Sequence, residues 1–144
     1  MTKKISRDQV FFAFQPGMTP VMEVDQGEEV LMETHDCFEG QLKSSADLLD
    51  SLDWDHINPA TGPVFVKGTK PGDVLRVDLL KVDIADQSIM VTLPGEGALG
   101  EKITEMETVV LKMDADTVVY KDRVRVPKRP MIGVIGVAPA SGSV

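Results

Sequence analysis

The sequence is poor in cysteine and in aromatic residues, and each shortage excludes a class of protein. Its 144 residues include one cysteine, Cys37, so an internal disulfide and a zinc site built from cysteines are excluded. A chain of this kind fits a reducing compartment, and we expect it to be cytoplasmic. Aromatic residues make up only 5% of the chain, so the core must be built chiefly from Val, Leu, Ile and Met. That composition suits packed strands at least as well as helices.

Clustered positive charge and long apolar runs are also missing. The net charge is −8, and the basic cluster Lys128-Arg129 is too small to make a groove. Nucleic acid is therefore excluded as a partner, because phosphate binding needs clustered Lys and Arg. The apolar stretch at residues 10–14 is followed by Pro16-Gly17 and is too short for a signal segment or a membrane span. We expect a protein that binds neither nucleic acid nor a membrane.

What the sequence does contain is a series of turn signals at short intervals. Pairs rich in Pro, Gly and Asn recur at residues 16–17, 58–59, 71–73 and 94–95, with short apolar or alternating runs between them. This spacing is typical of many strands in a sandwich or barrel. Strands are predicted over residues 21–24, 29–34, 63–66, 74–84, 89–93, 108–113, 117–121 and 131–137. The predicted fold class is mostly β, sandwich- or barrel-like, in a single domain spanning residues 1–144.

Three local patterns refine this expectation. Along residues 75–79 the apolar side chains occupy odd positions and along residues 80–84 even positions, which predicts a bulge or sharp bend at Leu79-Leu80. Residues 113–117 predict a hairpin connection. Ser44 as a cap, with Asp47 three residues later and leucines at positions 48, 49 and 52, predicts one short helix of about two turns.

An almost wholly apolar run lies at residues 130–139, bounded by prolines and carrying Gly133 and Gly136. Because it is apolar on both faces, it predicts a strand buried on both sides. The two glycines indicate that another backbone or a ligand comes close. Either this is a terminal strand of the core, or partner structure that covers it is missing.

The densest polar group lies at residues 33–41, directly after a predicted strand. Glu33, His35 and Asp36 are residue types that hold a divalent metal, which activates bound water and polarises a carbonyl. On a regular strand Asp36 would point away from Glu33 and His35, so the two carboxylates converge only if the strand breaks near His35. A solvated acidic loop is the simpler interpretation of this spacing.

Two neighbouring features are also open to two interpretations. Cys37 could be a nucleophile with His35 or His56 as its base, but a cysteine in this context is more often a small buried hydrophobe, and Asp36 disfavours its thiolate. The loop at residues 58–63, Asn-Pro-Ala-Thr-Gly-Pro, can present polar groups to a small substrate or can serve only as a turn.

Several motifs together resemble the acetamidase/formamidase family. They are Glu33-Thr-x-Asp36-Cys37-Phe38 with Gln41; the run at 49–63 ending in Ile-Asn-Pro-Ala-Thr-Gly-Pro; Gly68-x-x-x-Gly72-Asp-Val-Leu75; Pro94-Gly-x-Gly97; and Pro-Met-Ile-Gly-Val-Ile-Gly-Val-Ala-Pro at 130–139. The resemblance runs in order from about residue 10 to residue 144. It likens this chain to the N-terminal part of an acetamidase-like amidohydrolase, and the β-rich fold to the N-terminal portion of that family's fold.

The resemblance implies hydrolysis of small linear amides such as acetamide and formamide to a carboxylate and ammonia, with zinc and/or calcium at the site. Glu33 and Asp36 match acidic active-site positions, so they are the implied catalytic residues and metal ligands. His35 is not required by the pattern and keeps an open role as a further ligand. Asn58, Thr61 and Gly62 match the loop near the site and are the implied substrate-binding residues.

The family pattern also includes a Gly-Gly-Asn segment and a Gly-Asp-x-His segment, neither of which occurs in this chain. We therefore expect the remaining ligands to come from a C-terminal part absent here or from a second chain, and we expect a homo-oligomer. The alternative is a catalytically inactive, truncated β module that acts in oligomeric association, because an uncovered apolar strand promotes association.

Overall fold

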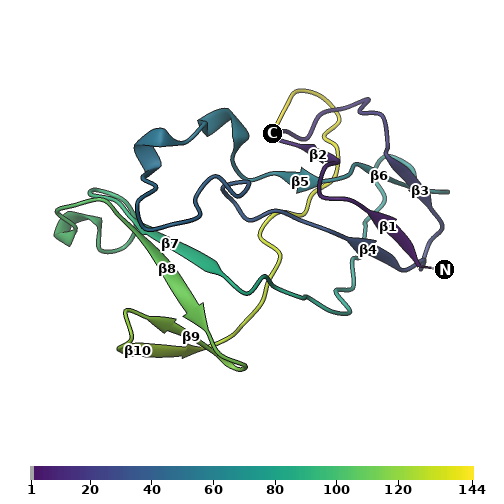
Figure 1. Cartoon of the computed structure of the whole chain (residues 1–144). Helices are drawn as coiled ribbons and strands as arrows, with labels where there is room; N and C mark the ends of the chain where they lie inside the picture. The colour runs from purple at the N-terminus through teal and green to yellow at the C-terminus, as the bar shows by residue number, and fades with distance from the viewer. Residues whose placement is uncertain (1) are drawn as a thin grey trace. The chain divides into compact units, whose positions relative to one another are not determined.

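The computed structural model describes residues 2–144, which form short strands joined by turns (Figure 1). Among residues 2–144, helical structure is limited to three single turns of 3₁₀ helix, so the predicted mostly β fold class is confirmed. The chain divides into two compact units. Unit 1 comprises Met1–Glu39, Trp54–Leu79 and Ile132–Val144, and unit 2 comprises Gly40–Asp53 and Leu80–Met131. Within residues 2–144, no helix has the length and apolarity needed to cross a membrane.

Unit 1 contains three two-stranded sheets. Strand β1 (Lys3–Ile5) runs parallel to β4 (Val30–Met32), and β3 (Met22–Val24) runs parallel to β6 (Val64–Val66). Strand β2 (Val10–Phe11) is antiparallel to β5 (Ala60–Thr61). Because side chains alternate between the two faces of a strand, β1 turns Ile5 inward and β3 turns Val24 inward. Both side chains are buried.

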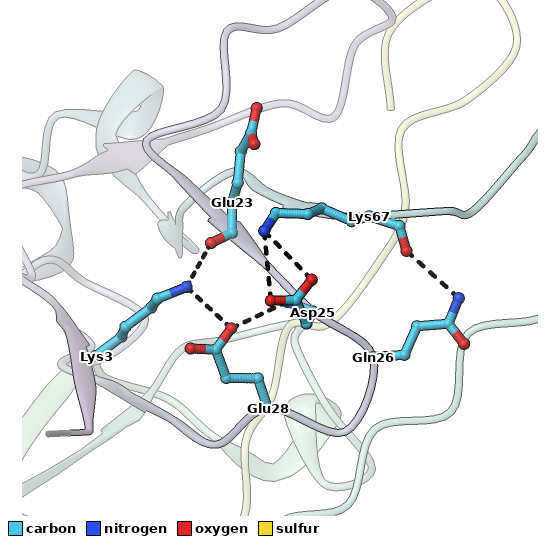
Figure 2. A network of polar contacts seen from close by, with 6 residues as sticks. All are labelled: Lys3, Glu23, Asp25, Gln26, Glu28 and Lys67. Atoms are coloured by element: carbon cyan, nitrogen blue, oxygen red, sulfur yellow. Dashed lines mark hydrogen bonds and ion pairs between the residues drawn. The ribbon is translucent and has the colours of Figure 1, made fainter.

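A network of polar contacts connects β1, Lys67 directly after β6, and the turn that follows β3 (Figure 2). The Glu28 carboxylate accepts hydrogen bonds from the Asp25 backbone N–H and from Lys3 Nζ, each 2.9 Å long. Lys67 Nζ forms an ion pair with Asp25 at 3.2 Å. The Asp25 N–H and, next, Lys3 hold the pKa of Glu28 below its usual value. Exposed pairs of this kind are individually weak, but together they fix the path of the turn.

Unit 2 is built on one antiparallel sheet in the order β10-β9-β8-β7. Its strands are β7 (Ser88–Thr92), β8 (Glu107–Met113), β9 (Thr117–Tyr120) and β10 (Val124–Pro127). The predicted hairpin at 113–117 is confirmed, since Met113 pairs with Val118 and the Asp114 N–H donates to the Thr117 carbonyl at 2.9 Å. Val109 and Val119 are buried.

The predicted short helix after Ser44 is wrong in type and extent. Only a 3₁₀ turn, η1 (Leu49–Ser51), forms there, with Leu49 and Leu52 buried. The Asp47 carboxylate does reach back to the Ser44 N–H and also to that of Lys43, both at 2.8 Å. These side-chain bonds satisfy the backbone locally and compete with helix formation, which is costly to nucleate over two turns.

Two predicted strands, at residues 74–84 and 131–137, are not formed among residues 2–144. No strand pairs with either segment, and a strand requires a partner ladder. The expectation that 131–137 is buried on both sides is also wrong, because Met131 is 74% exposed and Val137 is 66% exposed.

The bulge or sharp bend predicted at Leu79-Leu80 is not formed, since neither residue lies in a strand or a bend. The change of apolar phase coincides instead with the boundary between the two units. Unit 1 ends its second segment at Leu79 and unit 2 resumes at Leu80. Ion pairs two residues apart lie on each side of this boundary, Arg76 with Asp78 at 2.9 Å and Lys81 with Asp83 at 2.7 Å. The charged side chains therefore lie at even-numbered positions before the boundary, as Arg76 and Asp78 do, and at odd-numbered positions after it, as Lys81 and Asp83 do.

The approach of another backbone or a ligand, predicted at Gly133 and Gly136, is not observed among residues 2–144; Gly136 instead has a side chain as its close neighbour. A Cβ at Gly136 would lie 3.0 Å from Cε1 of Phe14, whereas a Cβ at Gly133 would have no neighbour within 4 Å. The Phe14 N–H also donates to the Val144 carbonyl at 2.7 Å, and the Val144 N–H donates back at 3.1 Å. Gly133 therefore has no packing role among the described residues, whereas the missing side chain of Gly136 leaves room for the Phe14 ring.

Candidate functional site

The acidic segment that begins at Glu33 continues from β4 but is not strand. Strand β4 ends at Met32, after which the Glu33 N–H still donates to the Ile5 carbonyl at 3.0 Å. Turn structure then follows, with Glu39 at a φ of 53° and Gly40 at 70°. The break that would release Glu33 and Asp36 from the alternation of a strand is therefore present.

Glu33 is held by a lysine from the neighbouring strand. Its Oε1 lies 2.7 Å from Lys4 Nζ, and its side chain is about one-third exposed, at 32%. The hydrogen bond from Lys4 keeps the pKa of Glu33 below its ordinary value. Glu33 is accordingly an anion at neutral pH, suited to electrostatic roles or to ligation rather than to carrying a proton.

His35 and Asp36 each have a local backbone partner. His35 Nε2 lies 3.1 Å from the Arg7 carbonyl oxygen, and because that oxygen only accepts, Nε2 carries the hydrogen. In the neutral ring Nδ1 then holds the lone pair. Asp36 Oδ1 accepts from the Phe38 N–H at 2.8 Å, which closes a turn of the kind common for aspartate.

The predicted substrate loop lies directly against the acidic segment. The Thr61 hydroxyl donates to the Glu33 carbonyl at 2.8 Å, and the Asn58 N–H donates to the Cys37 carbonyl at 2.7 Å. The Gly62 N–H donates to Gln9 at 2.9 Å. Sequence reasoning placed Glu33, Asp36, Asn58, Thr61 and Gly62 in one site, and the structure brings these two segments together in unit 1.

A complete metal site is not formed by these residues alone. No group of three or more His, Cys, Asp or Glu side chains that could hold a metal ion occurs in residues 2–144. Glu33 is occupied by Lys4, while His35 and Asp36 bind separate backbone groups.

Cys37 has the environment of a poor nucleophile. Partial burial and the neighbouring Asp36 carboxylate both raise the pKa of the thiol, so the thiolate is disfavoured. The side chain is nevertheless exposed, so the interpretation as a buried hydrophobe does not hold either.

One pair beside the site was not predicted from the sequence. His56 Nδ1 lies 3.0 Å from Glu39 Oε2, and the His56 ring stacks at a tilt on Phe12 with 4.5 Å between centroids. His56 belongs to the turn η2 (Trp54–His56), two residues before Asn58. The only signal in the sequence was the Asp-Trp-Asp-His run preceding the loop.

Two open hollows, of about 240 and 410 Å³, lie elsewhere, in unit 2. The first is lined by residues of β8 and β9 with Ser45, Lys121 and Asp122, and the second by residues 102–107 with Thr92 and Lys121. None of the predicted site residues lines either one.

Comparison with known proteins identifies relatives for almost the whole chain. The model of the Acetamidase/Formamidase family matches residues 1–142. A putative formamidase of Schizosaccharomyces pombe is 31% identical over 129 residues, which are 81% of this chain and 31% of the relative. A predicted acetamidase/formamidase of Thermoanaerobacter tengcongensis is 41% identical in its crystal structure, with a TM-score of 0.93 over 100% of this chain. An acetamidase of Bacillus halodurans is 36% identical, with a TM-score of 0.94 over 98% of this chain.

The relatives are much longer than this chain. The 144 residues cover 48% of each of the two bacterial structures and about a third of the yeast protein. The motifs of the sequence, the mostly β architecture and these matches agree with one another. The chain belongs to the acetamidase/formamidase family.

Proposed function

We propose that this chain is part of an amidase that hydrolyses small linear amides, such as acetamide and formamide, to a carboxylate and ammonia. Its relatives are named acetamidases and formamidases, which supports the reaction class. The single observation that carries the proposal is the contact between the acidic segment and the substrate loop, made by the Thr61 hydroxyl on the Glu33 carbonyl and the Asn58 N–H on the Cys37 carbonyl.

In the proposed reaction, water adds to the amide carbonyl carbon, the C–N bond breaks, and ammonia leaves with a proton that the water has given up. Asp36 is exposed and is the proposed proton carrier, accepting a proton from the attacking water and passing it to the departing nitrogen. Glu33, kept anionic by Lys4, supplies fixed negative charge. Asn58, Thr61 and Gly62 are proposed to orient the amide.

Zinc or calcium belongs to the proposal as a cofactor that would polarise the substrate carbonyl. The residues of this chain fit such an ion only in part, since no group of three ligands occurs among the described residues. Glu33, Asp36 and the Nδ1 of His35 are the proposed contribution of this chain. The remaining ligands are proposed to come from polypeptide outside these residues. A cytoplasmic location is likewise proposed, on the single cysteine.

The test measures ammonia release from acetamide and formamide. The chain is assayed alone and after co-expression with the half of the Thermoanaerobacter tengcongensis enzyme that it does not cover, each with EDTA, zinc or calcium. We expect activity only with both halves present. Asp36→Asn should lower kcat by about 100-fold or more, since a positioned acid–base group contributes about 10²–10⁴-fold.

Asp50→Asn in η1 is the matched control, because Asp50 is an exposed carboxylate of unit 2, and it should leave the rate unchanged. If a folded assembly of both halves released no ammonia under any condition, the amidase proposal would be wrong. The remaining function would then be the alternative one, a catalytically inactive β module that acts in oligomeric association.

A further inference from the structure

The acidic segment and the substrate loop each contain a residue in the left-handed region of backbone conformation. Glu39 has a φ of 53° and Asn58 a φ of 52°. Asparagine adopts this conformation readily because its short side chain bonds locally, whereas glutamate adopts it rarely. A residue held in this way persists only where surrounding contacts stabilise it. The backbone at Glu39 therefore depends on what its side chain binds.

The Glu39 side chain reaches from the acidic segment to the turn η2. Its Oε2 accepts a hydrogen bond from His56 Nδ1 at 3.0 Å, and because a carboxylate oxygen only accepts, Nδ1 carries the hydrogen. The Glu39 side chain is 23% exposed, so this end of the pair is partly shielded from water. The His56 ring is supported by Phe12, which directly follows β2, and Phe11 of β2 pairs with Ala60 of the substrate loop.

The hydrogen bond between Glu39 and His56 lies close along the chain to the groups of the candidate site. His56 is two residues before Asn58, whose N–H donates to the Cys37 carbonyl at 2.7 Å. The Glu39 N–H donates to the Asp36 carbonyl at 3.1 Å, so Asp36 and Glu39 form the two ends of one turn. A displacement of Glu39 would therefore also displace Asp36, the proposed proton carrier, relative to the loop.

We propose that Glu39 and His56 are positioning residues, whose hydrogen bond holds the substrate loop at residues 58–62 against the acidic segment at residues 33–39 before the amide binds. The inference rests on the proposed function and adds to the site two residues that the sequence did not assign to it. Neither side chain acts on the amide itself. Both act through the place of the loop, which carries Asn58 and Thr61.

This role has a kinetic consequence that differs from that of a catalytic group. Without the hydrogen bond, the loop spends more time away from the acidic segment. A substrate that binds only the closed arrangement then binds more weakly, in proportion to the closed fraction that is lost. Saturating substrate restores the closed arrangement, so KM rises while kcat stays the same. Because a partly exposed pair shifts such an equilibrium by up to about fivefold, KM should rise by about twofold to fivefold.

The first measurement uses the chain alone and follows exchange of the Asn58 amide with water by NMR. Glu39→Gly removes the carboxylate and also relieves the backbone, because glycine adopts a positive φ at no steric cost. His56→Phe keeps an aromatic ring beside Phe12 but has no donor. Both variants should keep the circular dichroism of the parent chain and exchange the Asn58 amide about twofold to fivefold faster. Glu39→Gln keeps an acceptor for His56 and should restore the parent rate to within about twofold.

Asp25→Asn is the matched control, because it weakens a different ion pair of unit 1, with Lys67, and should leave the Asn58 amide unchanged. The second measurement is KM and kcat of Glu39→Gly in the co-expressed assembly. Unchanged Asn58 exchange in Glu39→Gly, an equal change in Asp25→Asn, or a fall in kcat at constant KM would each overturn the proposal. An assembly that releases no ammonia would reject the proposed function, whereas the Asn58 amide of the chain alone decides separately whether the pair holds the loop.

Discussion

Lys4 in β1 lowers the pKa of Glu33, which directly follows β4. Because the hydrogen bond from Lys4 lowers the pKa of Glu33, the pair stabilises the folded state above the pKa of Glu33 in the unfolded chain. That contribution is lost as pH falls through the lower, folded-state value. A group raised in pKa would show the opposite dependence, so the sign of the effect is diagnostic.

We predict that Lys4→Met raises the pKa of Glu33 toward its usual value of 4.5. The measurement is an NMR titration of the Glu33 side-chain carboxyl between pH 2 and 7, together with denaturation midpoints across the same range. The parent chain should lose more stability on acidification than the variant. Lys102→Met, an exposed lysine of the turn Gly100–Lys102, is the control and should leave the Glu33 titration unmoved; an equal shift in both variants would argue against the specific pair.

At the scale of elements, the loop between β7 and β8 depends on one glycine. The Gly95 N–H donates to the Gly100 carbonyl at 3.0 Å, and a Cβ at Gly100 would lie 2.5 Å from the Gly95 carbonyl carbon. Since that neighbour is backbone and cannot rotate away, the loop itself would have to open. Overpacking of this kind costs about 1–3 kcal/mol.

We therefore predict that Gly100→Ala destabilises the chain by about 1–3 kcal/mol, measured by urea denaturation. Gly133→Ala is the matched control, because a Cβ there meets nothing within 4 Å, and it should change stability by less than about 0.5 kcal/mol. Equal stability of the two variants would mean that the Gly95–Gly100 approach is not made in solution.

Most strands that pair with a neighbour in the chain were predicted from the sequence, but so were β3, β4 and β6, whose partners lie far away along the chain. Strands β7, β8 and β9 follow one another in a meander, so local pattern and tertiary pairing agree. Strand β1, Lys3–Ile5, was missed because two lysines and one buried isoleucine carry no visible periodicity, and it forms only by pairing with β4, about 27 residues away along the chain. Residues 74–79 show the converse, an alternating pattern whose partner strand the described residues do not supply.

The approach of the acidic segment to the substrate loop was expected from the sequence. Motif resemblance placed Glu33, Asp36, Asn58 and Thr61 in one site, although sequence separation gives no distance. The sequence could not indicate the bonding partner of each side chain. Lys4 pairs with Glu33, the Phe38 N–H donates to Asp36, and the Arg7 carbonyl lies against His35. These partners depend on which segments of the backbone lie beside β4 in the folded chain, and that is a tertiary property. The roles of these residues, and a homo-oligomeric state, stay predictions.

For the whole molecule, the uneven distribution of backbone pairing should be visible in amide hydrogen exchange. Strand β8 pairs with β7 over Glu107–Leu111 and with β9 at Lys112 and Met113, so those of its amides that donate across either pairing open only through disruption of the sheet. Residues 74–79 and 132–137 have no such pairing among the described residues. Local opening free energies follow local pairing and burial, so the two classes of amide should differ in protection by several orders of magnitude.

We predict that, in dilute solution of the chain alone, amides of residues 74–79 and 132–137 exchange near the unprotected rate while the central amides of β8 exchange slowly. The measurement is mass spectrometry of peptides after timed deuterium labelling. Repeating the labelling at tenfold lower concentration controls for self-association. Slow exchange of residues 74–79 in the dilute chain, equal to that of β8, would contradict the prediction, because it would mean that this backbone already has a partner within the chain.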